Sequence, residues 1–209
     1  MRMNKKLKYL KSLPYLVVTI LSLSFSVLKK HEPEMQLGNV CVRFTPGSQC
    51  IPFISSAIRG AKRTLHIQAY SWTSEELTHE VNRAKQRGVR VFILLDKSHM
   101  KINNCIKSFM RNGIDVLIDR VPGIAHNKII IADDDTVITG SFNFSNAAEH
   151  KNVENVLKIK DKEIAKAYLR NWYSRRSFSK DIRDPYNAEL NRHPWKEKTN
   201  SRNYFNSIS

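Results

Sequence analysis

The strongest constraint on the fold is the stretch of residues 89–95, which is apolar at almost every position. A strand with apolar side chains on both faces is typical of a sheet that is covered on both sides. Before this stretch, Ser74 can cap a helix that ends at Gly88. After it, residues 100–111 have the character of a helix. A buried strand between two helices predicts an α/β fold.

Strand and helix signals alternate along the rest of the chain in the same way. We expect further strands at residues 40–44, 65–69, 115–118, 128–132, 136–139 and 153–159, and further helices at residues 51–61 and 161–173. This order predicts a mixed β-sheet sandwiched between helices, in one domain of residues 40–175. Residues 29–39 are predicted to form a linker, and residues 176–209 a basic, polar C-terminal tail.

Residues 1–28 are expected to be a signal peptide or an N-terminal anchor. Basic side chains precede an apolar stretch of residues 13–28, and Ser24 and Ser26 give the small-x-small pattern of a cleavage site. The stretch is short for a spanning helix, but two lysines follow it directly, so an uncleaved anchor is the alternative. We therefore expect a secreted or periplasmic protein, or one held at a membrane by this segment.

The cysteines agree with an oxidising compartment. Cys41 and Cys50 are close in sequence, and Pro46 and Gly47 between them can turn the chain. A disulfide between Cys41 and Cys50 is one expectation, and two buried thiols are the alternative. Cys105 lies in a predicted helix and is expected to be a core thiol.

The chain is strongly basic, with 35 Lys and Arg against 19 Asp and Glu and a net charge of +16. The excess is spread over the leader, the predicted domain and the tail. A basic folded domain suits a polyanionic partner, either nucleic acid or an anionic membrane surface. The alternative is a charge excess that only keeps the protein soluble.

One segment combines residues suited to phosphodiester chemistry. A neutral imidazole at His126 can attack phosphorus without bringing negative charge to it. Lys128 lies two residues further and on a strand would share its face, so its ammonium can neutralise a phosphate oxygen. Ser141 and Asn143 can donate to the same oxygens, and Gly140 allows a close backbone approach.

These residues have the spacing H-x-K-x4-D-x6-G-S-x-N, which resembles the signature of the phospholipase D superfamily. Six fixed positions make the motif far more specific than a lone glycine-rich loop. The resemblance runs from about residue 40 to residue 173, and it is to short, single-motif bacterial members: the Nuc-type endonucleases and small secreted phospholipase D proteins. It implies a phosphodiesterase that works through a phosphohistidine intermediate.

The resemblance also implies roles for two carboxylates and for a second subunit. Glu154 stands where the family has a glutamate that orients the nucleophile, and Asp133 is the motif aspartate, which is structural in this family. Members with two motifs use two facing histidines. Because this motif occurs once, the resemblance implies a homodimer, in which His126 of the partner subunit protonates the leaving group.

We expect no metal or other cofactor. The remaining histidines lack metal-ligand spacing, and the acidic residues 133–135 are predicted to form a solvated turn. His66, Gln68 and Tyr70 alternate on a predicted strand and could line the cleft, although an ordinary structural role is the stronger expectation.

The substrate is less constrained than the reaction. A nuclease with little sequence preference is the first expectation, since Lys151, Lys158 and Lys160 near Glu154 could follow a phosphate backbone. A phospholipase D that hydrolyses phosphatidylcholine-type lipids to phosphatidic acid is the alternative. A binding protein without activity, which holds nucleic acid or anionic lipid, is a third and weaker hypothesis, because every motif position is filled.

Overall fold

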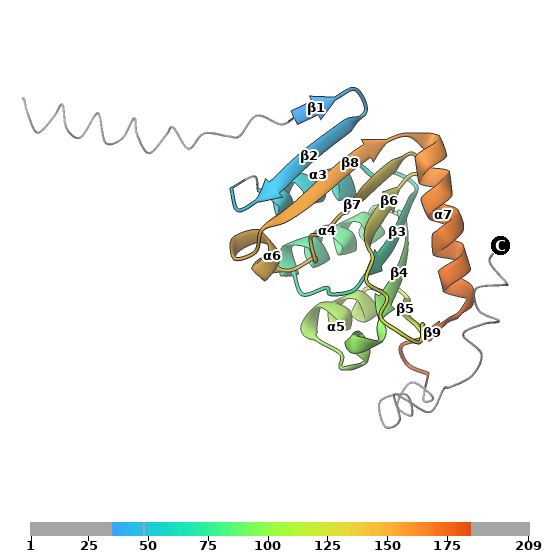
Figure 1. Ribbon diagram of the computed structural model, residues 1–209. Coiled ribbons are helices and arrows are strands. Elements are labelled where there is room, and N and C mark those ends of the chain that lie inside the picture. Colours follow the sequence, from blue (N-terminus) through green and yellow to red (C-terminus); the bar gives the residue numbers. More distant parts are fainter. Residues whose placement is uncertain (1–34, 48, 185–209) are drawn as a thin grey trace, which may run out of the picture. The chain divides into compact units, whose positions relative to one another are not determined.

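The computed structural model describes residues 35–47 and 49–184 (Figure 1). Within them, nine strands form one mixed sheet in the order β1-β2-β8-β7-β6-β3-β4-β5-β9. Strands β3, β4 and β5 are parallel neighbours, and the other neighbouring strands are antiparallel. The bounds are β1 Met35–Leu37, β2 Val40–Thr45, β3 Thr64–Ala69, β4 Arg90–Asp96, β5 Val116–Asp119, β6 Lys128–Ala132, β7 Thr136–Gly140, β8 Glu154–Lys160 and β9 Ser179–Asp181. The predicted α/β fold with a mixed sheet is confirmed.

Helices cover both faces of this sheet (Figure 1). They are α3 Cys50–Gly60, α4 Glu75–Gln86, η1 Lys97–Met100 (a 3-10 helix), α5 Asn104–Arg111, α6 Asn146–His150 and α7 Lys162–Ser177. The predicted cap of α4 is present, because the Ser74 side chain accepts a hydrogen bond from the Leu77 N–H. Asp161 caps α7 in the same way through the Ile164 N–H. Both helices therefore begin where the sequence indicated.

The two faces of the sheet bury separate apolar clusters. On one face, α3, α4 and α5 pack against Ile130 of β6 and its neighbours. On the other face, Trp172 of α7 packs with Ile129 and Ile131, and its indole N–H donates to the Ile67 carbonyl at 3.0 Å. Successive residues of β6 thus point into different clusters. This arrangement explains why the inner strands are continuously apolar.

The folded domain extends beyond the predicted bounds of 40–175. Strand β1 lies within the predicted linker 29–39, and β9, which pairs with β5, lies within the predicted tail. Both are three-residue edge strands, which are too short to show an alternating pattern. The predicted leader 1–28 and residues 185–209 lie outside the described residues. Among the helices that are described, none has the length and hydropathy needed to cross a bilayer.

The structure contains no disulfide between Cys41 and Cys50, so it does not have the expected bridge. Cys41 lies near the start of β2, whereas Cys50 begins α3 after the chain has passed the other end of that strand. Both side chains are buried, and burial is the main reason that the pKa of the Cys50 thiol is raised to about 12.

Candidate active site

The motif residues other than Asp133 meet at one end of the sheet. Lys128 is the first residue of β6, Gly140 the last of β7 and Glu154 the first of β8. Because these three neighbouring strands are antiparallel, those positions lie at the same end. Tyr70 follows the last residue of β3, which is the neighbour of β6 on its other side. The fold therefore brings together a site whose parts are separated in sequence.

His126 and Lys128 form the centre of this site. His126 is exposed on the loop before β6, and its ring lies against the Tyr70 ring with centroids 4.5 Å apart. Lys128 is only 6% exposed, and its ammonium donates to the His126 carbonyl oxygen at 2.6 Å. The ammonium also lies 5.1 Å from the centroid of the Tyr70 ring. The imidazole is thus open to a substrate while the cation beside it is fixed.

The charge state of Lys128 reflects two opposing effects. Burial lowers the pKa of its ammonium, because a charged group is less stable away from water. The carboxylates of Glu154 and Asp96 raise that pKa. A cation held in this way is suited to neutralise charge on a phosphoryl group.

Ser141 and Asn143 lie in a loop directly after β7. Phe142 and Phe144 between and after them are buried, so the two polar residues alternate with core residues. The Ser141 hydroxyl donates to Glu154 at 2.5 Å, and the amide oxygen of Asn143 is buried without a hydrogen-bond partner among the described residues. The amide oxygen can only accept hydrogen bonds, so the group of Asn143 that could hold a phosphate oxygen is its amide nitrogen.

Gly140 is required by the strand beside it. Its φ is 149°, and a Cβ added there would lie 2.2 Å from the Asn155 carbonyl oxygen. The Ser141 N–H donates to that same oxygen at 3.2 Å. The close approach predicted for this glycine is therefore to β8, and it sets the position of Ser141.

Glu154 contacts its neighbours and not His126. Its carboxylate accepts from the Ser141 hydroxyl and, at 2.8 Å, from the Asn152 side-chain amide. Within the described part of the chain it makes no hydrogen bond with His126. Its role in orienting the imidazole remains a prediction.

Asp133 lies at the opposite end of β6, in the turn to β7. It has a φ of 54°, and its carboxylate accepts from the backbone N–H groups of Lys62, Arg63 and Thr64 at 2.7 to 3.0 Å. Burial would raise the pKa of this carboxyl, but the three hydrogen bonds hold it below the usual value. This geometry agrees with the structural role expected of Asp133.

The other described histidines differ in their surroundings. The His66 ring is buried against α7 and shares a hydrogen bond with the Tyr173 hydroxyl at 3.1 Å. The buried His99 ring accepts from the Trp72 N–H at 3.0 Å. His79 and His150 are exposed on α4 and α6. Of the alternating group His66, Gln68 and Tyr70, only Tyr70 contacts the motif histidine directly, and alternation along the strand was the sole sequence signal for it.

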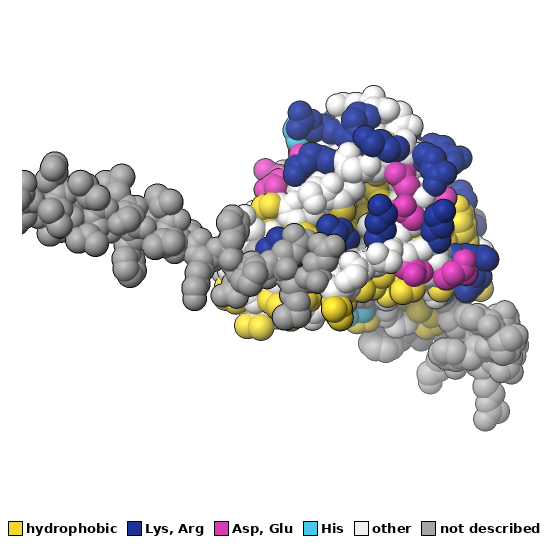
Figure 2. Space-filling view, turned by 90° about the horizontal axis from the view of Figure 1, so that it is seen from above, with side chains coloured by type: hydrophobic (Ala, Val, Ile, Leu, Met, Phe, Trp, Pro, Cys, Tyr) yellow, Lys and Arg dark blue, Asp and Glu magenta, His cyan; other side chains and the backbone are white. Residues whose placement is uncertain are grey.

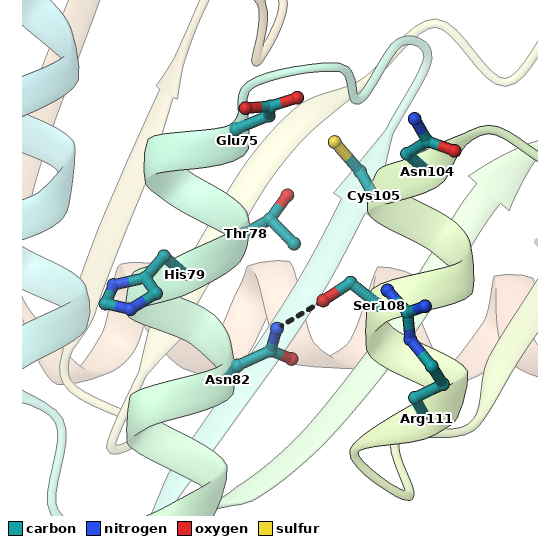
Figure 3. A pocket seen from close by; sticks show the side chains of 8 residues that line it. All are labelled: Glu75, Thr78, His79, Asn82, Asn104, Cys105, Ser108 and Arg111. Carbon is teal, nitrogen blue, oxygen red and sulfur yellow. Dashed lines mark hydrogen bonds between the residues drawn. The ribbon is translucent and has the colours of Figure 1, made fainter.

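A groove elsewhere in the domain is separate from this site (Figure 3). It has a volume of about 260 Å³ and lies between α4 and α5, where the Asn82 amide donates to the Ser108 hydroxyl at 2.9 Å. Its lining residues are Glu75, Thr78, His79, Asn82, Asn104, Cys105, Ser108 and Arg111. No motif residue lines it, so the chemistry is not placed there.

Comparison with known proteins identifies the family. Residues 54–175 match the family described as cardiolipin synthase, PLD-like domain. The chain belongs to the phospholipase D superfamily. It is 41% identical over 180 residues to a protein named phospholipase D from Rickettsia prowazekii, covering 83% of this chain and 88% of that one. It is 33% identical to human mitochondrial cardiolipin hydrolase, over 59% of this chain and 49% of that protein.

A solved structure has the same fold. Nuc from Salmonella typhimurium, a phospholipase D family member, is 35% identical with a TM-score of 0.64, over 68% of this chain and 96% of that chain. With these relatives, the chain is a phosphodiesterase of the phospholipase D superfamily. The family predicted from the motif is confirmed.

Proposed function

We propose that this protein hydrolyses phosphodiesters through a covalent bond to His126, in an active site completed by a second copy of the chain. The observation that carries the proposal lies at His126: its side chain is exposed, and its backbone carbonyl oxygen accepts a hydrogen bond from the buried Lys128 ammonium at 2.6 Å. Nucleophile and phosphate-binding cation are thus fixed relative to each other before a substrate arrives.

In the first step, a ring nitrogen of His126 attacks phosphorus, and the bond from phosphorus to the leaving oxygen breaks. The leaving oxygen takes a proton from the protonated His126 of the partner subunit. In the second step, water attacks phosphorus and gives its proton to that now neutral imidazole, and the P–N bond breaks. Lys128 and the amide nitrogen of Asn143 hold the non-bridging oxygens in both steps, and Ser141 joins them when its hydroxyl turns from Glu154 to the phosphate.

The second subunit is needed because the sequence contains one copy of the motif. Glu154, a carboxylate at the same end of the sheet, accepts hydrogen bonds from Ser141 and Asn152. A homodimer with two-fold symmetry would place two equivalent imidazoles on either side of one phosphate.

The distribution of side chains favours a phospholipid as the substrate. Large apolar residues are exposed next to the motif: Val153 precedes Glu154 and is 87% exposed, and Ile124 precedes His126 by two residues and is 58% exposed. Phe44, which pairs with Asn155, is 56% exposed. Exposed apolar groups around a reactive centre suit an interface with lipid.

Several basic side chains support this choice by their position. Figure 2 shows Lys and Arg gathered over the side of the domain where β8 ends and α7 begins. Arg63, Arg90, Lys160 and Lys162 are exposed there, at the end of the sheet away from the motif. Lys158, which the sequence suggested might follow a phosphate backbone, lies 4.8 Å from the Phe53 ring on the face covered by α3.

Nucleic acid is the second candidate. The similarity to Nuc favours it, and Lys151 is exposed close to Glu154.

We also propose, on the predicted leader 1–28 alone, that the protein acts outside the cytoplasm or at a membrane. Export would bring the domain to lipid surfaces.

A substrate panel in EDTA tests the proposal. The full-length protein is incubated with phosphatidylcholine vesicles, cardiolipin vesicles, plasmid DNA, single-stranded DNA and RNA, beside His126→Ala and the control His79→Ala. We expect release of the headgroup alcohol by the wild type and the control, and none by His126→Ala. If nucleic acid is cleaved and neither lipid is, the protein is a nuclease and not a phospholipase. Turnover by His126→Ala would refute the mechanism.

Sedimentation velocity tests the second subunit. The active species is expected to sediment as a dimer. A fully active monomer would contradict the shared site.

A further inference from the structure

The loop that carries His126 is held by a buried carboxylate outside the motif. We propose that Asp96, the last residue of β4, is a positioning residue that fixes His126 for attack. This inference rests on the proposed role of His126 as nucleophile. It adds a residue that acts through the backbone and never touches the substrate.

The contact is direct and short. The Asp96 side chain is 1% exposed, and one of its oxygens accepts a hydrogen bond from the Ala125 N–H at 2.7 Å. The other oxygen accepts from the Ser98 N–H at 2.9 Å. Ala125 is itself buried and directly precedes His126. One carboxylate therefore joins the end of β4 and the start of η1 to the catalytic loop.

The residue on the other side of His126 is anchored independently. The Asn127 carbonyl oxygen accepts from the Tyr70 N–H at 3.0 Å, and its side-chain amide donates to Gln68 at 3.1 Å. With Ala125 and Asn127 both fixed, the backbone of His126 has little freedom. Loss of the anchor at Ala125 would let the imidazole move although every motif residue remained.

A buried carboxylate is costly unless it is compensated. Among the described residues, no cationic side chain forms an ion pair with Asp96. The adjacent Lys97 ammonium instead donates to the carbonyl oxygens of Val121 and Pro122, at 3.3 and 2.9 Å. The hydrogen bonds of Asp96 go to backbone N–H groups, and one of these belongs to the loop of the nucleophile. A carboxylate that is buried at this place and bonded to the loop of the nucleophile points to a role in the site.

The charge of Asp96 provides a readout that packing alone would not change. The groups facing the Lys128 ammonium are the carboxylates of Glu154 and Asp96, the Tyr70 ring and the His126 carbonyl oxygen. Both carboxylates raise the pKa of Lys128 against the effect of burial. Removal of the Asp96 charge should therefore lower the pH at which activity is lost on the alkaline side.

The key variant is Asp96→Asn, because it preserves shape but can accept only one of the two N–H hydrogen bonds and carries no charge. The matched control is Glu80→Gln, another buried carboxylate, which lies on α4 and pairs with Arg59 of α3 at 3.1 Å. Steady-state kinetics are measured from neutral to alkaline pH on the substrate hydrolysed by the wild type. Dimer content and thermal unfolding are recorded for each variant.

For Asp96→Asn we expect kcat to fall roughly 10- to 100-fold with KM changed by less than about threefold, because misplacement affects the reaction step more than binding. Its activity should also be lost at a lower pH on the alkaline side of the pH–rate profile (the alkaline limb). Glu80→Gln should retain the wild-type kcat and the wild-type alkaline limb. Asp96→Glu, which keeps the charge but displaces the acceptor, should lose kcat without moving the limb.

Wild-type kcat in folded Asp96→Asn would overturn the inference, and so would a loss of kcat equal to that of Glu80→Gln. If Asp96→Asn does not fold, Asp96→Glu decides, and wild-type kcat there would overturn the positioning role. Activity in His126→Ala would instead refute the proposed function, so the two failures can be distinguished.

Discussion

Acid should destabilise this domain through His66, a histidine that the catalytic site does not use. The imidazole is 2% exposed and stacks on Phe92 with ring centroids 4.9 Å apart, under Trp172 and Tyr173 of α7. Burial lowers its pKa from 6.5 to about 4, although the carboxylate of Asp134 acts in the opposite direction. The folded state therefore holds the neutral ring at pH values where the unfolded chain binds a proton.

The sign and size of the effect follow from linkage. Because the folded pKa is depressed, the stabilisation is fully present above pH 6.5 and is lost as the pH falls toward 4. Between pH 7 and pH 5, this group alone should reduce the free energy of unfolding by about 2 kcal/mol. That is a large part of the stability of a typical domain.

The measurement is urea unfolding of the wild type and of His66→Phe at pH 7, 6 and 5. Phenylalanine can fill the aromatic site but cannot titrate, so the stability of the variant should fall less with pH, by about 2 kcal/mol at pH 5. His99 is buried in both proteins, and its contribution cancels in the comparison. His79→Gln, at an exposed position, should follow the wild type. Parallel pH dependences for wild type and His66→Phe would refute the reasoning.

Two further substitutions test how the site is built. Gly140→Ala should lower the free energy of unfolding by about 2 kcal/mol or more, since its Cβ would meet the Asn155 carbonyl oxygen at 2.2 Å at a φ of 149°; unchanged thermal unfolding would show that β8 can move away. Tyr70→Ala should reduce kcat by about tenfold or more, whereas Tyr70→Phe should retain it, because the ring supports His126 at 4.5 Å. Equal kcat values for the two Tyr70 variants would contradict this support.

The inner strands could be predicted because burial on both faces requires apolar residues at almost every position. Residues 128–132 were predicted as a strand and are β6, and the apolar run 89–95 is β4 shifted by one residue. Both strands are covered on their two faces, so almost every position is apolar. The helix predicted at 100–111 is α-helical only from Asn104 to Arg111, because the Asn103 side chain caps α5 by accepting from the Ile106 N–H; Met100 instead ends η1.

The short elements could not be predicted, since their own residues do not determine them. Strands β1 and β9 exist through pairing with β2 and β5, and α6 has only five residues. Elements of this length are formed by their neighbours and lack a periodic pattern.

The site shows the same division. The motif indicated the chemistry of His126 and Lys128 from spacing alone. The contact of Asp96 with this loop could not be predicted, because Asp96 is 29 residues away from Ala125 in the chain. Nothing in the sequence marks a carboxylate at the end of an apolar strand as the partner of one particular N–H group. Only the parallel arrangement of β4 beside β3 brings it under the catalytic loop.

The arrangement of exposed and buried groups explains why a second copy would matter to this chemistry. The proposed nucleophile, His126, is exposed, and so is Ser141, whereas Lys128 and Asp96 are buried. A phosphodiester on such a surface would remain in contact with water, which weakens electrostatic stabilisation of the transition state. A partner subunit placed over the exposed groups would exclude water and supply the proton donor in one step. Catalysis and dimerisation should then be lost together on dilution, and a specific activity independent of protein concentration across the dimer's dissociation range would separate them.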